Sequence, residues 1–435
     1  MNDALQSWGR YPRAAQQVIR LRDRFAPLPL PTPDGHALPR GNGRSYGDVC
    51  LDDGGTLLDA RGLDRFIAFD PATGVLRCES GMLLGTILNF CVPRGWFLPV
   101  VPGTRFVTLG GAIANDVHGK NHHAVGSFGC HVRAFELLRS DGHRITCTNA
   151  ENPDWYAATI GGLGLTGLIT WVELQLRRVP GAWFDTETFR FDRLADFFEL
   201  SEQSARDHEY TVAWVDCTTR GAALGRGVFS RGNHAAPPAN AHAPHPVRLS
   251  MPFTPPFSLV NGASLRAFNA VHFHRAPKAT RHALQHYLPW LFPLDGILEW
   301  NRMYGPRGFL QYQCVLPPTN AEDGVRELLE RIAASGTGSF LAVLKQFGEM
   351  HSRGLLSFPR PGTTLALDFA NQGQRTFALL DRLDDVVAEA GGAVYPAKDA
   401  RMSGERFRQY FPAWKQFEAF IDPAFSSGFW RRVSQ

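Results

Sequence analysis

The chain has 435 residues, which is long for one core and predicts two or three structural units. A hydrophobic share of 44% and a charged share of 20% are typical of a globular protein and argue against a disordered chain, a fibre or a membrane bundle. The net charge is only +4 and no basic stripe is present, which argues against nucleic acid as a partner.

Further patterns give expectations for location and metal content. No apolar run approaches the ~18 residues of a membrane span, and the N-terminal stretch lacks the basic-then-apolar order of a secretory signal. We therefore expect a cytoplasmic protein. The seven cysteines are scattered and none lies in a CxxC pair, which favours reduced, mostly buried thiols. We expect no disulfide framework and no structural metal.

Residues 1–180 are rich in glycine and predict a mixed α+β domain. The apolar spacing over 82–95 is helical and stops at Pro93 and Gly95. Short strands bounded by turn dipeptides are predicted within 56–63, 65–81, 136–148 and 167–179.

Aromatic residues become denser and glycines rarer near residue 180, where we place a boundary to a second domain over 181–390. Segment 231–257 is crowded with Pro, Ala and His and predicts a mobile loop. Residues 391–435 return to a turn-rich style and are expected to rejoin the first domain. Helices are predicted within 193–210, 322–336 and 374–392, the last ending at Gly391 and Gly392, and strands within 308–317, 338–348 and 362–370.

Two glycine-rich stretches dominate the first domain: "PRGNGRSYGD" at 39–48 and "PGTRFVTLGGAIANDVHG" at 102–119. Glycine lets backbone amides approach a ligand closely and point at phosphate oxygens. The first stretch is not a Rossmann fingerprint, because Asp48 rather than a helix follows its last glycine. Simple turns remain an alternative for either stretch alone, but a third one, "IGGLGLTGLI" at 160–169, makes that alternative less attractive.

The second stretch continues into "HGKNHH", which places three histidines and a lysine within six positions. Adjacent His122 and His123 would point in opposite directions in an extended chain, and no cysteine or carboxylate cluster completes a tetrahedral set. A metal site is therefore disfavoured. Two alternatives stay open, namely structural histidines and the wall of a cofactor pocket.

These motifs, in this order, resemble the PCMH-type FAD-binding domain of the vanillyl-alcohol oxidase superfamily. "HGKNHH…GSFG", "FLQYQ", "LSFPRPG" and "YPAKD" are similar, more narrowly, to the flavoprotein oxidases of decaprenylphosphoryl-β-D-ribose epimerisation. The resemblance covers essentially the whole chain. It implies an α+β, two-domain fold with a substrate (cap) domain built on an antiparallel sheet flanked by helices.

The resemblance also implies noncovalent FAD. Many superfamily members attach the flavin through a histidine after the first glycines, but Arg44 and Ser45 stand there in this sequence. The cofactor-binding residues implied are Arg40, Gly41, Asn42, Gly43, Arg44, Ser45, Tyr46, Gly47, Asp48, Gly103, Thr108, Leu109, Gly110, Gly111, Asn115, Asp116, Val117, His118, Ile169 and Tyr395.

Oxidising a secondary alcohol needs a base for the hydroxyl proton and donors that steady charge on the reduced flavin. By resemblance, Lys398 and His118 are the catalytic candidates. A surface ion pair between Lys398 and Asp399 is the alternative. The mycobacterial enzymes carry a cysteine where this chain has Ala366, which leaves slightly more room. The substrate-binding residues implied are Tyr46, Lys120, Gln311, Gln313, Lys345 and Ala366.

The resemblance implies oxidation at C2 of a polyprenylphosphoryl-β-D-ribose to the 2-keto sugar, as the first half of an epimerisation to arabinose. A short-chain reductase would then be a partner. Phe253, Phe257 and Leu259 suggest a peripheral contact with the membrane surface that holds the lipid. One alternative is an alditol or aldonolactone oxidase of the same fold. The other, from a different class, is a noncatalytic flavin-binding protein.

Overall fold

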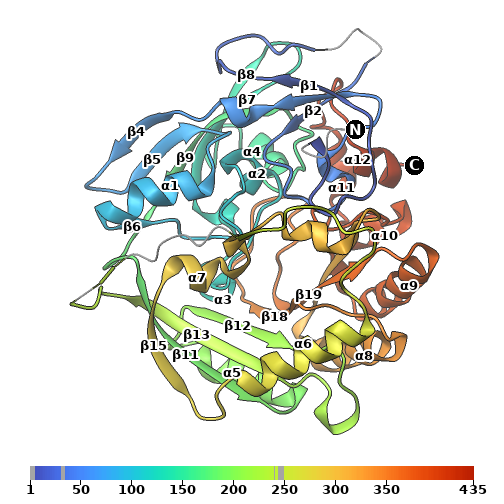
Figure 1. The fold of residues 1–435 in the computed structure, drawn as a ribbon. Helices are drawn as coiled ribbons and strands as arrows, with labels where there is room; N and C mark the ends of the chain where they lie inside the picture. The colour runs from blue at the N-terminus through green and yellow to red at the C-terminus, as the bar shows by residue number, and fades with distance from the viewer. Residues whose placement is uncertain (1–4, 31–34, 240, 243–248) are drawn as a thin grey trace.

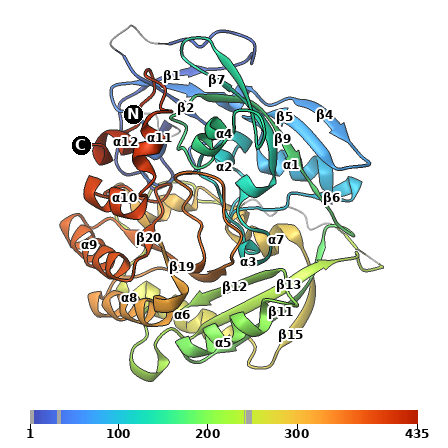
Figure 2. The same cartoon turned by 180° about the vertical axis from the view of Figure 1, so that it is seen from behind.

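The computed structural model describes residues 5–30, 35–239, 241–242 and 249–435. Two sheet-based regions lie one above the other, with the last part of the chain running along both of them (Figures 1 and 2). The first region carries the glycine-rich stretches, and the second carries a large antiparallel sheet. The α+β class predicted from the sequence is confirmed.

The first region contains two sheets. A parallel sheet has the order β1 (Gln17–Arg20), β3 (Thr56–Asp59), β2 (Ala37–Arg40). An antiparallel sheet has the order β4 (Phe66–Asp70), β5 (Val75–Glu79), β9 (Leu168–Gln175), β7 (Val132–Leu138), β8 (Arg144–Thr148). A short pair joins β6 (Trp96–Phe97) to β10 (Arg177–Arg178).

Four short helices accompany these sheets: α1 (Leu84–Cys91), α2 (Leu109–Ala114), α3 (His122–Val125) and α4 (Pro153–Thr159). The α1 helix buries its apolar positions, and the 3-10 turn that follows it ends at Gly95, whose φ of 77° suits glycine. The α2 helix begins at Thr108, whose hydroxyl accepts a hydrogen bond from the Gly111 amide at 3.3 Å.

The second region is an eight-stranded antiparallel sheet (Figure 1). Its order is β15 (Arg281–His286), β11 (Trp183–Phe191), β13 (Gly227–Ala235), β12 (Tyr210–Val215), β18 (Ala342–Phe347), β19 (Gly362–Ala370), β17 (Phe309–Leu316), β20 (Ala393–Val394). Around it lie α5 (Leu194–Ser204), α6 (Gly262–Arg275), α7 (Tyr287–Leu291), α8 (Ala321–Ser335) and α9 (Gln374–Glu389).

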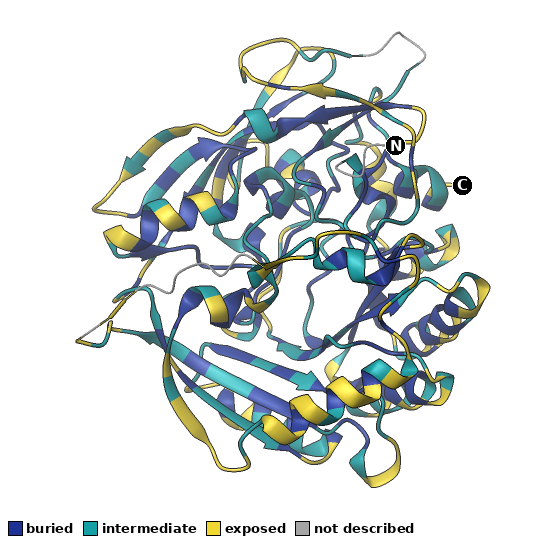
Figure 3. Cartoon of the chain, viewed as in Figure 1, coloured by how far each residue is buried: buried dark blue, intermediate teal, exposed yellow. Residues whose placement is uncertain are grey.

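The α5, α8 and α9 helices cover one face of this sheet, each with a buried side and an exposed side (Figure 3). Strand residues alternate between the two faces. On β17, Leu310, Tyr312 and Cys314 join the core under the helices, while Gln311 and Gln313 face the opposite way. All eight residues of β17 are buried, so the second face of the sheet is covered as well.

Two sequence predictions need correction here. The predicted mobile loop at 231–257 begins too early, because residues 231–235 form the end of β13 and pair with β11. Residues 240 and 243–248 of that segment lie outside the described residues. The helix predicted within 193–210 is shorter than expected, since α5 ends at Ser204 and the chain has already become strand at Tyr210.

The C-terminal residues return to the first region as α10 (Gly404–Tyr410), α11 (Trp414–Glu418) and α12 (Gly428–Val433). Ala37 of β2 exchanges backbone hydrogen bonds with Ala424 and Ser426. Arg432 pairs with Asp48 at 2.7 Å and with Asp399 at 3.1 Å. The C-terminal segment therefore ties β20, in the large sheet, to the first glycine-rich stretch.

Candidate active site

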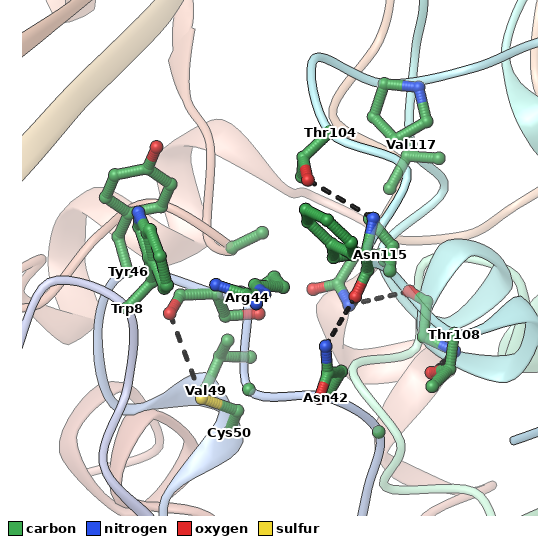
Figure 4. A pocket seen from close by; sticks show the side chains of 18 of the residues that line it. Trp8, Asn42, Arg44, Tyr46, Val49, Cys50, Thr104, Thr108, Asn115 and Val117 are labelled. Atoms are coloured by element: carbon green, nitrogen blue, oxygen red, sulfur yellow. Dashed lines mark hydrogen bonds between the residues drawn. The ribbon is translucent and has the colours of Figure 1, made fainter. Parts of the chain in front are cut away.

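A pocket lies between the first region and the face of the large sheet that is opposite the helices. One side of it, which we call the cradle wall, consists of Ser80 and the lining residues within 39–46, 102–118 and 163–169. The other side, the sheet wall, consists of alternate residues of β17, β18 and β19. In Figure 4, Arg44 lies between Trp8 and Tyr46 on one side and Asn42 and Asn115 on the other. Tyr395 and Lys398 reach the pocket from the C-terminal segment.

Close backbone approach explains the glycines of the cradle wall. A Cβ atom on Gly41 would lie 2.1 Å from the Thr108 hydroxyl, so only glycine lets the first stretch touch the cap of α2. The Asn42 amide donates to the Phe106 carbonyl at 2.8 Å and locks the two stretches together. A Cβ atom on Gly47 would lie 1.6 Å from the Asp399 carbonyl. Gly47 thus lets the segment that carries Lys398 approach the cradle wall.

Several polar atoms of the cradle wall fit a cofactor rather than the chain itself. Arg40 Nε, Arg44 Nε, Ser80 Oγ and Asn115 Oδ1 are buried in residues that line the pocket, and within the described residues they have no hydrogen-bond partner. Buried polar atoms without partners are rare in native proteins. Guanidinium donors, amide oxygens and glycine-flanked amides suit the pyrophosphate and the polar edge of a flavin. The residues present therefore fit FAD.

The sheet wall is built from side chains. Adjacent positions across the strands are Gln313 opposite Ala366 on β19, and Lys345 of β18 opposite Thr364. Leu341 and Val343 add an apolar strip beside Ala366. The wall thus offers amide and ammonium groups flanking an apolar strip, which suits a ligand with hydroxyls and a C–H face.

Lys398 lies where the two walls meet. Its Nζ stands 4.1 Å from the centre of the Tyr46 ring. Burial lowers the pKa of Lys398 to about 8, and the Asp368 carboxyl opposes that change. Asp399, the partner in the alternative interpretation, is directed instead to Arg432. Lys398 is thus an amine inside the pocket whose proton affinity lies close to neutral pH.

His118 connects the two walls. Its Nδ1 lies 3.1 Å from Lys345 Nζ, and its Nε2 lies 2.8 Å from the Gln313 side-chain amide. Burial, followed by the charges of Lys345 and His122, holds the pKa of His118 well below its usual value. The imidazole is therefore neutral, and its Nε2 accepts a hydrogen from the Gln313 amide nitrogen, which can only donate.

The neighbouring histidines contribute to structure. His122 Nδ1 accepts the Gly348 amide hydrogen at 3.2 Å, and His123 Nε2 lies 2.9 Å from the His208 carbonyl. Both contacts fix the loop after His118 against the second region. Of the alternatives left open by the sequence, the structural interpretation describes His122 and His123, and the pocket interpretation describes His118.

Most of the predicted site residues come together in this pocket, and five do not. Lys120 was predicted to bind substrate, but its Nζ donates to the carbonyls of Trp290 (3.2 Å) and Leu291 (2.8 Å). The structure places the following predicted residues in the pocket lining: Arg40, Gly41, Asn42, Gly43, Arg44, Ser45, Tyr46, Gly103, Thr108, Gly110, Gly111, Asn115, Val117, His118, Ile169, Gln311, Gln313, Lys345, Ala366, Tyr395 and Lys398.

The other four predicted cofactor residues support the pocket from behind. Gly47 makes room for Asp399, and Asp48 pairs with Arg432. Leu109 is fully buried in the core of the first region. The Asp116 carboxylate accepts the Gly129 amide hydrogen at 2.8 Å and the Ser357 hydroxyl hydrogen at 2.6 Å. These four residues hold the cradle wall in shape.

Sequence reasoning missed several lining residues. Trp8 stacks on Arg44, with the guanidinium carbon 4.1 Å from the ring centre. No sequence motif predicts a pocket residue at position 8. Asp295 and Glu299 come from two short 3-10 turns on either side of β16. Val343 and Thr364 could have been found, because they lie two positions from Lys345 and from Ala366, respectively, on predicted strands.

Comparisons with known proteins agree with this pocket. A model of the FAD binding domain matches residues 34–148, the part of the chain that forms most of the cradle wall. The decaprenylphosphoryl-β-D-ribose oxidase of Mycolicibacterium smegmatis is 35% identical over 99% of this chain and 97% of its own. The "uncharacterized protein in mprA 5′region" of Streptomyces coelicolor is 35% identical over 80% of this chain and 99% of its own. A putative D-arabinono-1,4-lactone oxidase of Neurospora crassa is 26% identical over 29% of this chain and 23% of its own.

The fold and the pocket define an FAD-dependent oxidoreductase that acts on a CH–OH group. With its PCMH-type FAD-binding domain, the chain belongs to the decaprenylphosphoryl-β-D-ribose oxidase family of the vanillyl-alcohol oxidase superfamily. The predicted cofactor, FAD, is confirmed.

Proposed function

We propose that the protein oxidises the C2 hydroxyl of a polyprenylphosphoryl-β-D-ribose to the 2-keto sugar. The observation that carries the proposal is the position of Lys398, an amine with a pKa of about 8 where the cradle wall meets the sheet wall. The full-length identity to an oxidase named for decaprenylphosphoryl-β-D-ribose supports the substrate class.

Bound FAD would supply the acceptor for the hydride that leaves the carbon. The FAD would lie noncovalently along the cradle wall, with Tyr395 beside it. In the chain, Lys398 hydrogen-bonds the substrate hydroxyl and, in its neutral form, takes the hydroxyl proton. His118, neutral and held between Lys345 and Gln313, orients these two side chains in the pocket rather than acting as a base. Gln311 and Gln313 orient the ribose hydroxyls, and Ala366 leaves room for its C–H face.

The test uses Lys398→Ala and, as a matched control, Lys415→Ala at an exposed lysine. Each holoprotein is mixed anaerobically with a short-chain prenylphosphoryl-β-D-ribose, and bleaching of the flavin band is followed by stopped flow. Lys398→Ala should retain FAD but reduce it at least about 100-fold more slowly, while Lys415→Ala should match the parent. Undiminished reduction in Lys398→Ala would remove this residue from the mechanism.

The same experiment separates the alternatives. An alditol or aldonolactone oxidase is supported by the similarity to the putative lactone oxidase over part of the chain. It predicts bleaching by xylitol or an aldonolactone and none by the prenylphosphoryl sugar. A noncatalytic flavin-binding protein predicts no bleaching by any of these compounds.

Two partners belong to this proposal. The 2-keto product needs a reductase to become the arabinose epimer, so we expect a short-chain dehydrogenase as the next enzyme. The lipid chain suggests a peripheral contact of this otherwise cytoplasmic protein with the inner membrane face. Within the described residues, no helix has the length and apolarity to cross a membrane.

Exposed apolar side chains support the membrane contact. Phe253 and Phe257 are 64% and 67% exposed. They follow β14 (Leu249–Ser250), which pairs with β16 (Ile297–Leu298) at the pocket lining. Sedimentation with liposomes, with and without anionic lipid, should pellet the protein, and Phe253→Ser combined with Phe257→Ser should release it. Absence of the parent from both pellets would contradict the contact.

A further inference from the structure

Two lysines line the same pocket, but their electrostatic surroundings differ. Burial lowers the pKa of Lys345 to about 7, and the ammonium groups of Lys120 and Lys398 contribute to that decrease. Lys398 is equally buried, yet the Asp368 carboxyl counteracts the effect of burial. Among the described residues, Asp368 is the one carboxyl that acts on Lys398 in this way. It was not predicted from the sequence.

Asp368 is held firmly beside the pocket, on the face of the sheet that Gln311 also occupies. It lies on β19 directly opposite Gln311 on β17, and only 1% of it is exposed. Its Oδ1 accepts a hydrogen bond from the Gln311 side-chain amide at 2.6 Å. Its backbone amide donates to the Ser339 hydroxyl at 3.0 Å. A buried carboxyl with so few donors is expensive to ionise unless a cation is near.

We propose that Asp368 is a positioning residue for the proposed oxidation: held by Gln311 on the pocket face of the sheet, its carboxyl favours the protonated form of the Lys398 amine. The inference rests on the proposed role of Lys398 and adds a residue behind it. Gln311 lines the pocket beside Asp368, and both side chains lie on the same face of the sheet, so the carboxyl acts on the amine from next to the pocket lining without touching the substrate.

Other groups around Lys398 also affect whether its amine is protonated. Tyr46 faces it from the first glycine-rich stretch, and Tyr304 lies close to Asp368. Burial and the Asp368 carboxyl raise the pKa of both phenols, which therefore remain neutral. His118 is neutral, and Lys345 is the remaining cation. Of the charged groups that face Lys398 within the described residues, Asp368 alone favours the ammonium form.

The pair is poised near neutral pH. Burial raises the pKa of Asp368 to about 7, against the Gln311 hydrogen bond and the Lys398 charge, which lower it. The pKa of Lys398 lies at about 8. An ionised Asp368 stabilises the ammonium that forms when the amine accepts the hydroxyl proton. A base works best when its pKa lies near the working pH, and Asp368 keeps that of Lys398 from falling below it.

The test measures the proton affinity of Lys398 directly. The chain has five lysines, so competitive acetylation of the holoprotein followed by peptide mass spectrometry resolves each of them. In Asp368→Asn, the labelling curve of Lys398 should move to lower pH by about one unit or more. Lys278 and Lys415 are exposed and serve as internal references that should not move. An unshifted Lys398 curve would overturn the proposal.

Two further variants guard against a purely structural effect. Asp384→Asn removes another buried carboxyl, paired with Arg401 outside the pocket lining, and should leave the Lys398 curve unchanged. Gln311→Met keeps Asp368 but removes the bond that favours its ionised form, so the Lys398 curve should again move to lower pH. If Asp368→Asn fails to fold, Gln311→Met decides: a curve like that of the parent would overturn the proposal.

A kinetic readout separates this inference from the proposed function. In Asp368→Asn, the low-pH limb of flavin reduction by the prenylphosphoryl ribose should move to lower pH, together with the labelling curve. If labelling shifts but the parent protein reduces no flavin with this sugar, the proposed substrate fails while the control of Lys398 by Asp368 stands. If the parent reduces its flavin and both curves of the variant stay in place, the inference fails alone.

Discussion

The cradle wall and the sheet wall face the same pocket but are made from different parts of the chain. The cradle wall presents backbone, and its glycines are required by close approach, as at Gly41 and Gly47. The sheet wall presents side chains at alternate strand positions, including a lysine and, next to Gln311 on the same face, a buried aspartate. Binding the cofactor and reacting with the substrate therefore depend on different parts of the chain. The cradle wall fixes its shape through close backbone contacts that only glycine allows, whereas the sheet wall buries ionisable side chains at a cost in stability.

The largest expected effect comes from Gly47→Ala in the support of the cradle wall. The new Cβ would meet the Asp399 carbonyl at 1.6 Å, and both partners are backbone that cannot rotate away. Unfolding of the apoprotein in urea should show a loss of about 3 kcal/mol or more. Gly296→Ala, where a Cβ meets open space, is the control and should match the parent. Equal stability of both variants would show that residue 47 does not lie close to the Asp399 carbonyl.

Lys345→Met should act in the opposite direction on the sheet wall. The folded pKa of Lys345 is about 7 against 10.5 for the free side chain, so the unfolded chain binds more protons between these values. The cost of burying this amine is therefore fully present below pH 7 and disappears as the pH rises toward 10.5. The stability of Lys345→Met relative to the parent should thus fall with rising pH, by at most about 1.4 kcal/mol per pH unit.

The measurement is urea unfolding of parent and variant at about pH 6, 7, 8 and 9, a range that brackets the folded pKa and part of the interval above it. Lys415→Met, at an exposed lysine, serves as the control and should differ from the parent by a constant amount. The same constant difference for Lys345→Met would contradict a depressed pKa. The variant should also lose activity, since His118 Nδ1 would lose its ammonium partner. A gain in stability together with a loss of activity in Lys345→Met would show that the sheet wall buries this amine for the reaction and not for the fold.

The two walls also differ in how far they could be predicted. The cradle wall comes mainly from two short stretches whose glycines and order are visible in the sequence, and most residues implied there line the pocket. The strands predicted within 308–317 and 362–370 are confirmed by β17 and β19, because their apolar runs are long. The stop of the third predicted helix is also correct, since Gly391 has a φ of 73°.

The features that the sequence did not predict depend on tertiary contacts. Lys120 belongs to the right motif, but whether its side chain turns toward the pocket is decided by the Trp290 and Leu291 carbonyls, 170 and 171 positions later. Residues 231–235 lack an apolar pattern and become strand because β11 and β12 flank them. Asp368 carries no motif, and its meaning appears only when β19 is placed beside β17. Local pattern cannot supply such pairings.

The smallest expected effect is that of Gly103→Ala, which sharpens the distinction within the cradle wall itself. Gly103 lines the pocket, and a Cβ atom added there would have no neighbouring atom within 4 Å, in contrast to Gly47. The substitution should therefore leave the stability of the folded apoprotein unchanged. The affinity for FAD should fall, because the added methyl group would lie where the cofactor has to approach the backbone. Titration of apoprotein with FAD, followed by flavin fluorescence, should give a Kd about tenfold higher, which corresponds to ~1.4 kcal/mol. The melting temperature of the apoprotein should remain that of the parent. An unchanged Kd would remove residue 103 from the cradle, whereas a lower melting temperature would mean that this glycine, like Gly47, serves the fold rather than the ligand.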